Sequence, residues 1–235
     1  DGDARALIGM VEALNHMPEL DVTGETLPKL LHHRPMQHDK SDDGHYNLLS
    51  ALHKSVRASD VDASLYWLAR AFQGGEDPCI IARRMTRMAS EDIGLAAPQA
   101  LSICLDAWNA YERLGSPEGE LALAQALIYL ASAPKSNAAY TALKAAMETA
   151  RDTGSLPPQM HSVNAPIRWM KDQGYAHNYQ YDHNDPDGFS GQNHFPADCL
   201  RQEFYTPSQR GFEKDIAHRL AEWAKLRQGK TNTDE

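Results

Sequence analysis

Apolar residues recur at helical spacing almost without interruption from Tyr46 to Asp152, and this pattern limits the fold more than any other feature of the chain. No period-two alternation competes with it, so strands are not expected. We predict an all-α fold, a helical array or bundle of about six helices over this region. The predicted apolar faces are Tyr46, Leu49, Leu52 and Val56; Val61, Leu65, Leu68 and Phe72; Ile81, Met85 and Met88; Leu101, Leu105 and Trp108; Leu121, Ala124, Leu127 and Leu130; Tyr140, Leu143 and Met147.

Capping residues divide this region into helices. Asp60 and the pair Asp77–Pro78 are typical of helix starts, because an aspartate can cap the first turn and proline fits its first position. We expect Pro98 and Pro117 to open two further helices in the same way. Gly154 is a plausible glycine end for the last one.

The segment from 155 to 211 has a different composition. It contains six of the 13 prolines and four of the nine tyrosines. Disordered segments are poor in aromatic residues, so we predict a long irregular strap packed against the helical body. A C-terminal helix is expected at 212–228, with Phe212, Ile216, Leu220 and Trp223 on one face.

The first 45 residues are less regular. Two short helices are predicted around Leu7–Leu14 and Leu27–Leu31, and a polar stretch follows them as an exposed connector, 35–45. The chain begins at Asp1 inside an apparent helix start, which suggests a piece of a longer protein.

The net charge is −9, from 23 Lys and Arg against 32 Asp and Glu, which argues against a wholly basic nucleic-acid binder. Three cysteines are too few for a disulfide framework and favour a reducing compartment. Neither a signal peptide nor an apolar run of about 20 residues is present, so we expect a cytoplasmic location and no membrane partner.

Sequence motifs for catalysis are missing. The chain has no GxxxxGK[ST] phosphate loop, and neither GxSxG nor HExxH occurs. We therefore expect no catalytic residues in this chain and no ATP hydrolysis by it.

Histidines invite a metal hypothesis, since four of the 11 fall within the connector or just before it: His32, His33, His38 and His45. The spacing offers no helical i, i+4 pair and no cysteine partner, so solvated loop residues are favoured and no metal or other cofactor is expected in the chain. The stretch 183–188 is similar to a calcium loop but has His194 at its twelfth position, so we interpret it as a turn.

Three arginines of one predicted helix, Arg83, Arg84 and Arg87, are candidates for contacts with DNA or an acidic partner. The alternative is a solvated helix face, favoured because Glu91 and Asp92 follow one turn later. Strap aromatics could stack on bases, although packing is the more common role of such residues.

Arg5 lies in a predicted first helical turn, where the helix dipole disfavours a cation. This placement favours a partner such as a phosphate.

Several long motifs resemble those of the replication-associated recombination protein A family, bacterial relatives of the Werner-helicase-interacting AAA+ ATPases. The resemblance covers residues 1 to about 228. The matching stretches are DGDAR at the start, HYNLLSALHKSVRASDVDASLYWLARAFQGGEDPCIIARRM, ASEDIGLAAPQAL, PEGELALAQALIYLASAPKSNAAY, NAPIRWMKDQGY and FYTPSQRGFE.

The resemblance implies that residues 1–34 are the remnant of an AAA+ lid and that 46–230 form a helical oligomerisation domain similar to a clamp-loader collar. Arg5, with Asp3 beside it, would be the sensor-2 arginine that reaches the γ-phosphate of ATP. A second basic residue commonly follows this arginine in the family, whereas Ala6 follows here. ATP and Mg would act only in the full-length ATPase.

The implied function is that of the lid and tetramerisation region of a DNA-dependent AAA+ ATPase in replication-fork maintenance, recombination and repair. Its implied partners are copies of itself in a homotetramer, DNA and single-stranded-DNA-binding protein, in a bacterial, nucleoid-associated setting. A helical protein-binding adaptor without nucleotide-linked function is the alternative. An independent metal-dependent hydrolase that uses the histidine-rich connector is the least favoured hypothesis.

Overall fold

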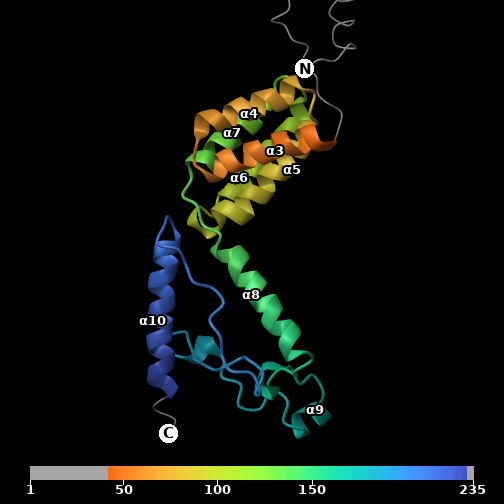
Figure 1. The fold of residues 1–235 in the computed structure, drawn as a ribbon. Helices are drawn as coiled ribbons and strands as arrows, with labels where there is room; N and C mark the ends of the chain where they lie inside the picture. Colours follow the sequence, from red (N-terminus) through yellow and green to blue (C-terminus); the bar gives the residue numbers. More distant parts are fainter. Residues whose placement is uncertain (1–41, 232–235) are drawn as a thin grey trace, which may run out of the picture.

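The computed structural model describes residues 42–231, which form helices joined by turns and irregular segments, with no strand in that range (Figure 1). The all-α prediction is therefore confirmed. The lid residues and most of the predicted connector lie outside the described residues. The helices are α3 (Asp42–Arg57), α4 (Val61–Gln73), α5 (Pro78–Met88), α6 (Ala100–Leu114), α7 (Glu120–Ser132), α8 (Ala138–Thr153), α9 (Arg168–Asp172) and α10 (Glu213–Thr231).

Helices α3 to α7 pack into one bundle around a continuous apolar core (Figure 1). Helix α7 lies at its centre and contacts α3, α4, α5 and α6. Most of the predicted apolar positions in α3 and α5 are buried there, as expected from their helical spacing. The largest fully buried side chains of the bundle are Leu52, Leu68, Ile81, Met85, Met88, Leu123, Leu127 and Leu130.

The capping predictions hold for α4 and α5. Asp60 accepts a hydrogen bond from the amide of Ala63 and begins α4, and Asp77 accepts one from the amide of Cys79 with Pro78 at the first helical position. The same device is wrong for α6 and α7, which begin after Gln99 and Gly119 without a side-chain cap.

The predicted inward faces of α6 and α7 are also partly wrong. Leu101 and Leu105 are each about two-fifths exposed, and Leu121 is 75% exposed. Small side chains of α6, including Ala100, Cys104 and Ala107, are buried instead. Small residues allow α6 and α7 to approach closely, so the leucines are rotated outward.

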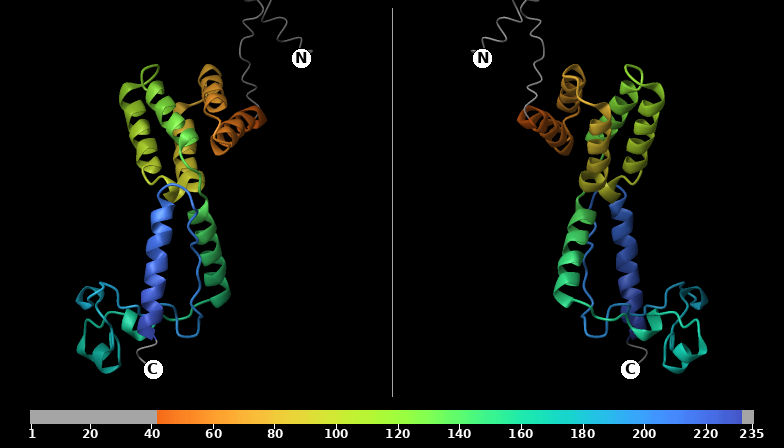
Figure 2. Two further views of the ribbon diagram at one scale, coloured as in Figure 1. Left: turned by 90° about the vertical axis from the view of Figure 1, so that its left-hand side faces the viewer. Right: turned by 90° about the vertical axis from the view of Figure 1, so that its right-hand side faces the viewer.

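Below the bundle, α8 and α10 extend as two long helices in the same general direction (Figures 1 and 2). Between them the chain is irregular from 154 to 212, with α9 and three-residue 3-10 turns, η3 (Met160–Ser162) and η4 (Asp182–Asn184), as its helical pieces. Its last part, about 200–210, runs back toward the bundle between α8 and α10 (Figure 2). Gly154 ends α8 with a positive φ of 61°, as predicted.

The top of α10 is attached to the bundle through buried polar contacts. Glu213, at the first residue of α10, is fully buried and accepts hydrogen bonds from the Tyr205 hydroxyl at 2.8 Å and the Ser208 amide at 2.9 Å. The Phe212 amide donates to the carbonyl of Ala96 at 2.9 Å. Burial alone would raise the pKa of Glu213, but hydrogen bonds from side chains and the Ser208 amide hold the pKa below its usual value.

None of the helices in the described part of the chain combines the length and apolar character needed to cross a membrane.

Candidate functional site: an ion-pair network between two regions

Helix α5 continues without a break into η1 (Ala89–Ile93), a π-helical turn. π-helical turns are rare and are found disproportionately at functional sites. In this structure η1 presents two carboxylates, Glu91 and Asp92, to the last turns of α3. The turn ends at η2 (Gly94–Ala96), where Gly94 has a positive φ of 52°.

Asp92 is the centre of the site and is only 7% exposed. Its Oδ2 lies 2.6 Å from Nε2 of His53, and its Oδ1 accepts a hydrogen bond from Nε of Arg57, also at 2.6 Å. Its backbone carbonyl accepts from the amide of Ser136 at 2.7 Å. One residue thus connects α3, η1 and the segment that leads into α8.

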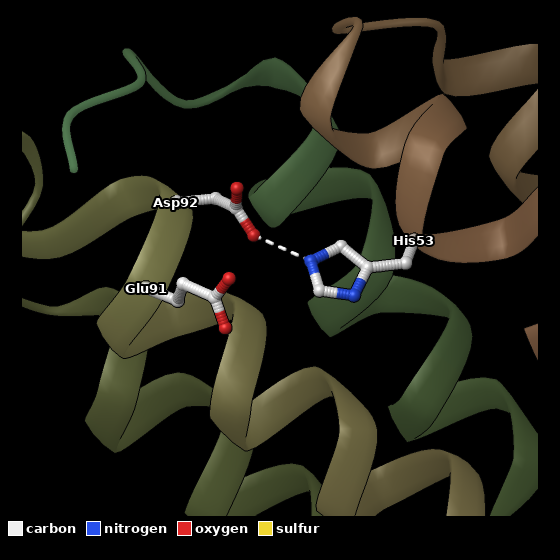
Figure 3. Close-up of side chains that lie close together, drawn as sticks. All are labelled: His53, Glu91 and Asp92. Carbon is white, nitrogen blue, oxygen red and sulfur yellow. Dashed lines mark hydrogen bonds and ion pairs between the residues drawn. The ribbon is translucent and has the colours of Figure 1, made fainter. Parts of the chain in front are cut away.

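His53 contacts both partners through Nε2, which lies 2.6 Å from Oδ2 of Asp92 and 3.2 Å from Nη2 of Arg57. An ionised carboxylate only accepts hydrogen bonds, so Asp92 is the acceptor in the first of these contacts. Arg57 and His53 are four residues apart on α3 and therefore lie on one face of the helix. Figure 3 shows His53 pointing from α3 toward Asp92 and Glu91.

The network also includes Glu91 and Arg87. Oε2 of Glu91 accepts a hydrogen bond from Nε of Arg87 at 2.7 Å, and Oε1 lies 3.5 Å from Nη2 of Arg57. Two arginines therefore face two carboxylates. This balance accounts for the stability of an ionised aspartate that is almost fully buried.

The pKa values follow the same balance. Burial would raise the pKa of Asp92, but the hydrogen bonds and charges of His53 and Arg57 outweigh burial and hold the pKa below its ordinary value. The hydrogen bond to Asp92 raises the pKa of Arg57. Both charges are therefore retained at neutral pH.

A cleft of about 420 Å³ opens beside this network. Three cations line it, and each already donates to a protein acceptor: Arg57 to Asp92, Lys135 to the carbonyls of Ala131 and Ala133, and Arg210 to the carbonyl of Lys135. Burial lowers the pKa of Lys135, against the attraction of Asp92. The cations that line the cleft therefore hold neighbouring segments of the chain together, and none of them is left as a reactive group.

His53, Glu91 and Asp92 also form a set with the chemistry of a metal site, since their ligand atoms lie within 4.8 Å of one another. The guanidinium of Arg57 contacts both carboxylates, so it occupies the position where a cation would be needed. The donor set fits an ion-pair network better than a metal ion.

The arginines predicted from the sequence lie on α5. Arg87 is exposed and paired with Glu91, as the nearby acidic residues suggested. Arg83 is exposed and Arg84 is half-buried, and within the described region neither has a hydrogen-bond or ion-pair partner. The predicted turn at 183–188 is confirmed by the hydrogen bond from the Gly188 amide to the Asp185 carbonyl. Asp3, Arg5 and the histidine-rich connector lie outside the described residues.

The sequence reasoning missed His53, Arg57 and the role of Asp92. The available signal was the i, i+4 spacing of His53 and Arg57, together with two adjacent carboxylates in an otherwise apolar stretch. Nothing local connects these two signals, because 35 residues separate Arg57 from Asp92.

Comparison with known proteins gives the network its context. Residues 58–224 match a family model described as the C terminal of MgsA AAA+ ATPase, and residues 1–57 match one described as the AAA C-terminal domain. His53 and Arg57 thus belong to one matched region, and Glu91 and Asp92 to the other. The network joins the two regions close to their boundary.

Curated relatives agree with these matches. Replication-associated recombination protein A of Coxiella burnetii is 45% identical over 241 residues, covering all of this chain and 55% of the relative. The Escherichia coli protein of the same name is 42% identical, covering 94% of this chain and 51% of the relative. ATPase WRNIP1 of Dictyostelium discoideum is 42% identical over 165 residues, covering 70% of this chain and 19% of the relative.

The chain spans about half the length of the bacterial relatives it matches most fully. The two family models match consecutive segments and together cover nearly the whole sequence, in agreement with the resemblance seen in its motifs. The chain therefore belongs to the MgsA family of AAA+ ATPases, the family of the replication-associated recombination protein A relatives.

Proposed function

We propose that this chain is the lid and tetramerisation region of a DNA-dependent AAA+ ATPase involved in replication-fork maintenance, recombination and repair. The observation that carries the proposal is the consecutive match to two C-terminal models of AAA+ proteins. The names of the relatives, replication-associated recombination protein A and ATPase WRNIP1, support the cellular role. The protein would act in the bacterial cytoplasm, associated with the nucleoid.

In this proposal the chain contributes to nucleotide sensing but does not hydrolyse ATP. Arg5, with Asp3 beside it, would act as the sensor-2 arginine toward the γ-phosphate when the ATPase domain holds ATP and Mg. A cation on a lid can stabilise charge that develops during phosphoryl transfer. Titration calorimetry of the chain alone should show no stoichiometric ATP binding, and tight binding would contradict this assignment.

The Asp92 network would make the two matched regions move together. Lid rotation is transmitted through α3 to the rest of the bundle only if α3 stays fixed against its neighbours, and the paired contacts of His53 and Arg57 with Asp92 add to the apolar packing that holds it there. We propose that this network couples the lid to the oligomerisation domain. In the full-length ATPase, Asp92→Asn should reduce the stimulation of ATP hydrolysis by DNA, while ATP hydrolysis without DNA persists. Stimulation equal to that of the parent protein would contradict the coupling.

Exposed apolar residues support assembly. Tyr140, Leu143 and Met147 follow one another at helical spacing on α8, and each is more than half exposed. A helix that leaves its apolar stripe uncovered is typical of an interface between subunits. We propose that this face of α8 is buried between copies of the chain in a homotetramer.

Light scattering at micromolar concentration tests the assembly. The chain should have the mass of a tetramer, and Leu143→Glu should reduce that mass without lowering helical content. The matched control is Lys144→Glu, which makes a larger charge change at the neighbouring position and should leave the mass unchanged. A monomeric parent chain would contradict the proposal.

Arg83 and Arg84, with Arg87 next to them, remain the proposed contact for DNA or for single-stranded-DNA-binding protein. The exposure of Arg83 and the absence of a protein partner for Arg83 and Arg84 in the described region support a role toward an anionic surface. Charge reversal of both residues should weaken binding of the full-length protein to one of these partners. Unchanged affinity for both DNA and single-stranded-DNA-binding protein would contradict this proposed contact.

A helical protein-binding adaptor is the second candidate. The two helices that extend from the bundle, α8 and α10, carry exposed apolar residues that suit an adaptor as well as an assembly domain. In the full-length protein, partner binding that is independent of ATP and of subunit assembly would favour this alternative.

A further inference from the structure

The irregular segment between α8 and α10 forms a cavity of about 630 Å³, which we call the tip cavity. Three stretches contribute its lining, 156–161, 173–178 and 196–198, and they lie near α9 and the end of α8 that is farthest from the bundle (Figures 1 and 2). The volume is within the range typical of ligand-binding pockets. None of the lining residues belongs to the Asp92 network.

Hydrogen bonds within the segment hold the walls of the tip cavity together. Nε2 of Gln159 donates to the carbonyl of Phe195 at 2.6 Å, which ties the first stretch to the third. The amide of Ala176 donates to the carbonyl of Met160 at 2.9 Å, which ties the second stretch to the first. The cavity is therefore preformed by contacts of the segment itself.

The backbone beside the cavity adopts an unfavourable conformation at two residues. Ala176 and Asn178 have φ values of 59° and 60°, in the left-handed region that a Cβ atom disfavours. Asn178 lines the cavity, and Ala176 lies between the lining residues Gly174 and His177. Strain of this kind persists only where surrounding contacts enforce it, and it is concentrated at sites that hold ligands.

Much of the lining is apolar and rigid. Three prolines and a methionine contribute to it, namely Pro157, Pro158, Pro196 and Met160. Proline side chains lose almost no conformational freedom when a ligand packs against them. The tip cavity therefore favours a ligand with an apolar body.

The polar part of the lining accepts hydrogen bonds and carries negative charge. Asp198 lines the cavity, and no lysine or arginine is among the lining residues. Within residues 42–231 the side chains of Asp198, Gln173 and Asn178 have no hydrogen-bond or ion-pair partner. A carboxylate and two amide oxygens thus surround an apolar cavity, an arrangement that suits a cation with an apolar stem.

We propose that the tip cavity binds an arginine side chain of a partner peptide, with the methylene stem against the prolines and the guanidinium against Asp198. Arginine is the best match because its planar group pairs with a carboxylate through two hydrogen bonds and is weakly hydrated, while its stem packs on apolar surface. A nucleic acid fits less well, because no cation lines the cavity to meet a phosphate. The proposal goes beyond the lid and assembly functions.

Fluorescence anisotropy with the full chain tests the site. The probe is the peptide Gly-Ser-Leu-Arg-Leu-Ser-Gly, amidated at its carboxyl end and labelled with an uncharged fluorophore at its amino end. We expect saturable binding with a Kd of about 100 μM that weakens as salt is added. The same peptide with citrulline, which keeps the shape of arginine without its charge, should bind at least about fivefold more weakly.

Variants locate the site. Asp198→Asn removes the charge of the cavity and should weaken binding at least about fivefold. Asp172→Asn makes the same change at an exposed position of α9 that does not line the cavity, and it should leave the affinity within about twofold.

A second pair of variants tests the cavity itself. Ala197→Trp fills it from an exposed lining position and should also weaken binding at least about fivefold. The matched control is Ala69→Trp, at an exposed position of α4, which should bind like the parent chain. Circular dichroism shows that each variant retains its helical content.

Four results would overturn the proposal. The first three are the absence of saturable binding by the parent chain, equal affinity for the citrulline peptide, and an equal loss of affinity in Asp172→Asn. The fourth is displacement of the peptide by agmatine, the free amine that corresponds to the arginine side chain, at concentrations similar to the Kd of the peptide. That result would identify a small amine as the ligand. Because the readout is peptide affinity, failure here leaves the tetramer mass and the nucleotide-dependent tests unaffected.

Discussion

Nε of Arg57 lies 2.6 Å from Oδ1 of Asp92, although 35 residues separate them in the sequence. The first belongs to the last turn of α3 and the second to the π-helical turn after α5. Their matched family regions meet at residues 57 and 58. This single contact ties the end of one region to the interior of the next, and it accounts for an aspartate being buried at this position.

Replacing Asp92 tests how much the network stabilises the fold. Asp92→Asn keeps the shape but removes the charge that holds Arg57 and His53, so we expect a loss of about 1–3 kcal/mol in unfolding free energy. The value is below that of a fully buried pair because Arg57 is 52% exposed. Urea unfolding measures it. Glu91→Gln, at a more exposed position, should cost less than about 1 kcal/mol, and an equal cost would contradict a special role for Asp92.

The pH dependence of stability provides a second test. Asp92 has a lower pKa in the folded than in the unfolded chain. At acidic pH the folded chain therefore binds fewer protons at this residue than the unfolded chain does, and a fall in pH favours unfolding. The contribution of Asp92 is therefore complete above the ordinary aspartate pKa of about 4 and is lost as the pH falls through the lower folded value.

The stability difference between the parent and Asp92→Asn should accordingly be constant near neutral pH and shrink below about pH 4. Glu213 also has a lowered pKa, but it is present in both proteins and cancels in the difference. Urea unfolding at a series of pH values checks this. A difference that stays constant down to pH 2 would mean that the charge of Asp92 is not what stabilises the fold.

The buried carboxylate of Glu213 should control how firmly α10 is attached to the bundle. Tyr205→Phe removes one of its donors and should cost about 1–2 kcal/mol. The effect should be local, with faster hydrogen exchange at the Phe212 amide, which donates to Ala96. Tyr179→Phe, which alters an exposed tyrosine in the same irregular segment, is the control. Unchanged exchange at Phe212 in Tyr205→Phe would show that Glu213 does not hold the junction.

Gly211 should tolerate substitution less well than Gly154. Its φ is +51°, and a Cβ atom would overlap the carbonyl oxygen of Ala96 as well as the ring of Pro134. Gly154 also has a positive φ, +61°, but nothing lies within 4 Å of its Cβ position. Both Gly→Ala variants bear the conformational cost of about 1 kcal/mol, and only Gly211→Ala adds a clash.

Thermal unfolding should therefore show a clearly larger decrease in Tm for Gly211→Ala than for Gly154→Ala. Equal decreases would indicate that the contact between Gly211 and Ala96 adds nothing to the attachment of α10.

The helices of the bundle were predictable because their signals are local. Asp60 and Asp77 cap the helices expected from them, and Gly154 ends α8 with the positive φ that glycine permits. The same reasoning was wrong where neighbours decided the outcome. Leu121 has the right spacing for a buried position, yet it is exposed because α7 turns Leu123 and Leu127 toward the core.

Sequence by itself determined the helical class of this protein, two of its helix starts and the motifs of its family, since each depends on residues close together in the chain. Only the tertiary structure decided that Asp92 faces Arg57, that Glu213 is buried beneath Tyr205, and that Gln173 and Asp198 line one cavity. Periodicity states which side of a helix is apolar but not which distant charge will face it. Those pairings exist only after packing brings the helices together and removes water from between them.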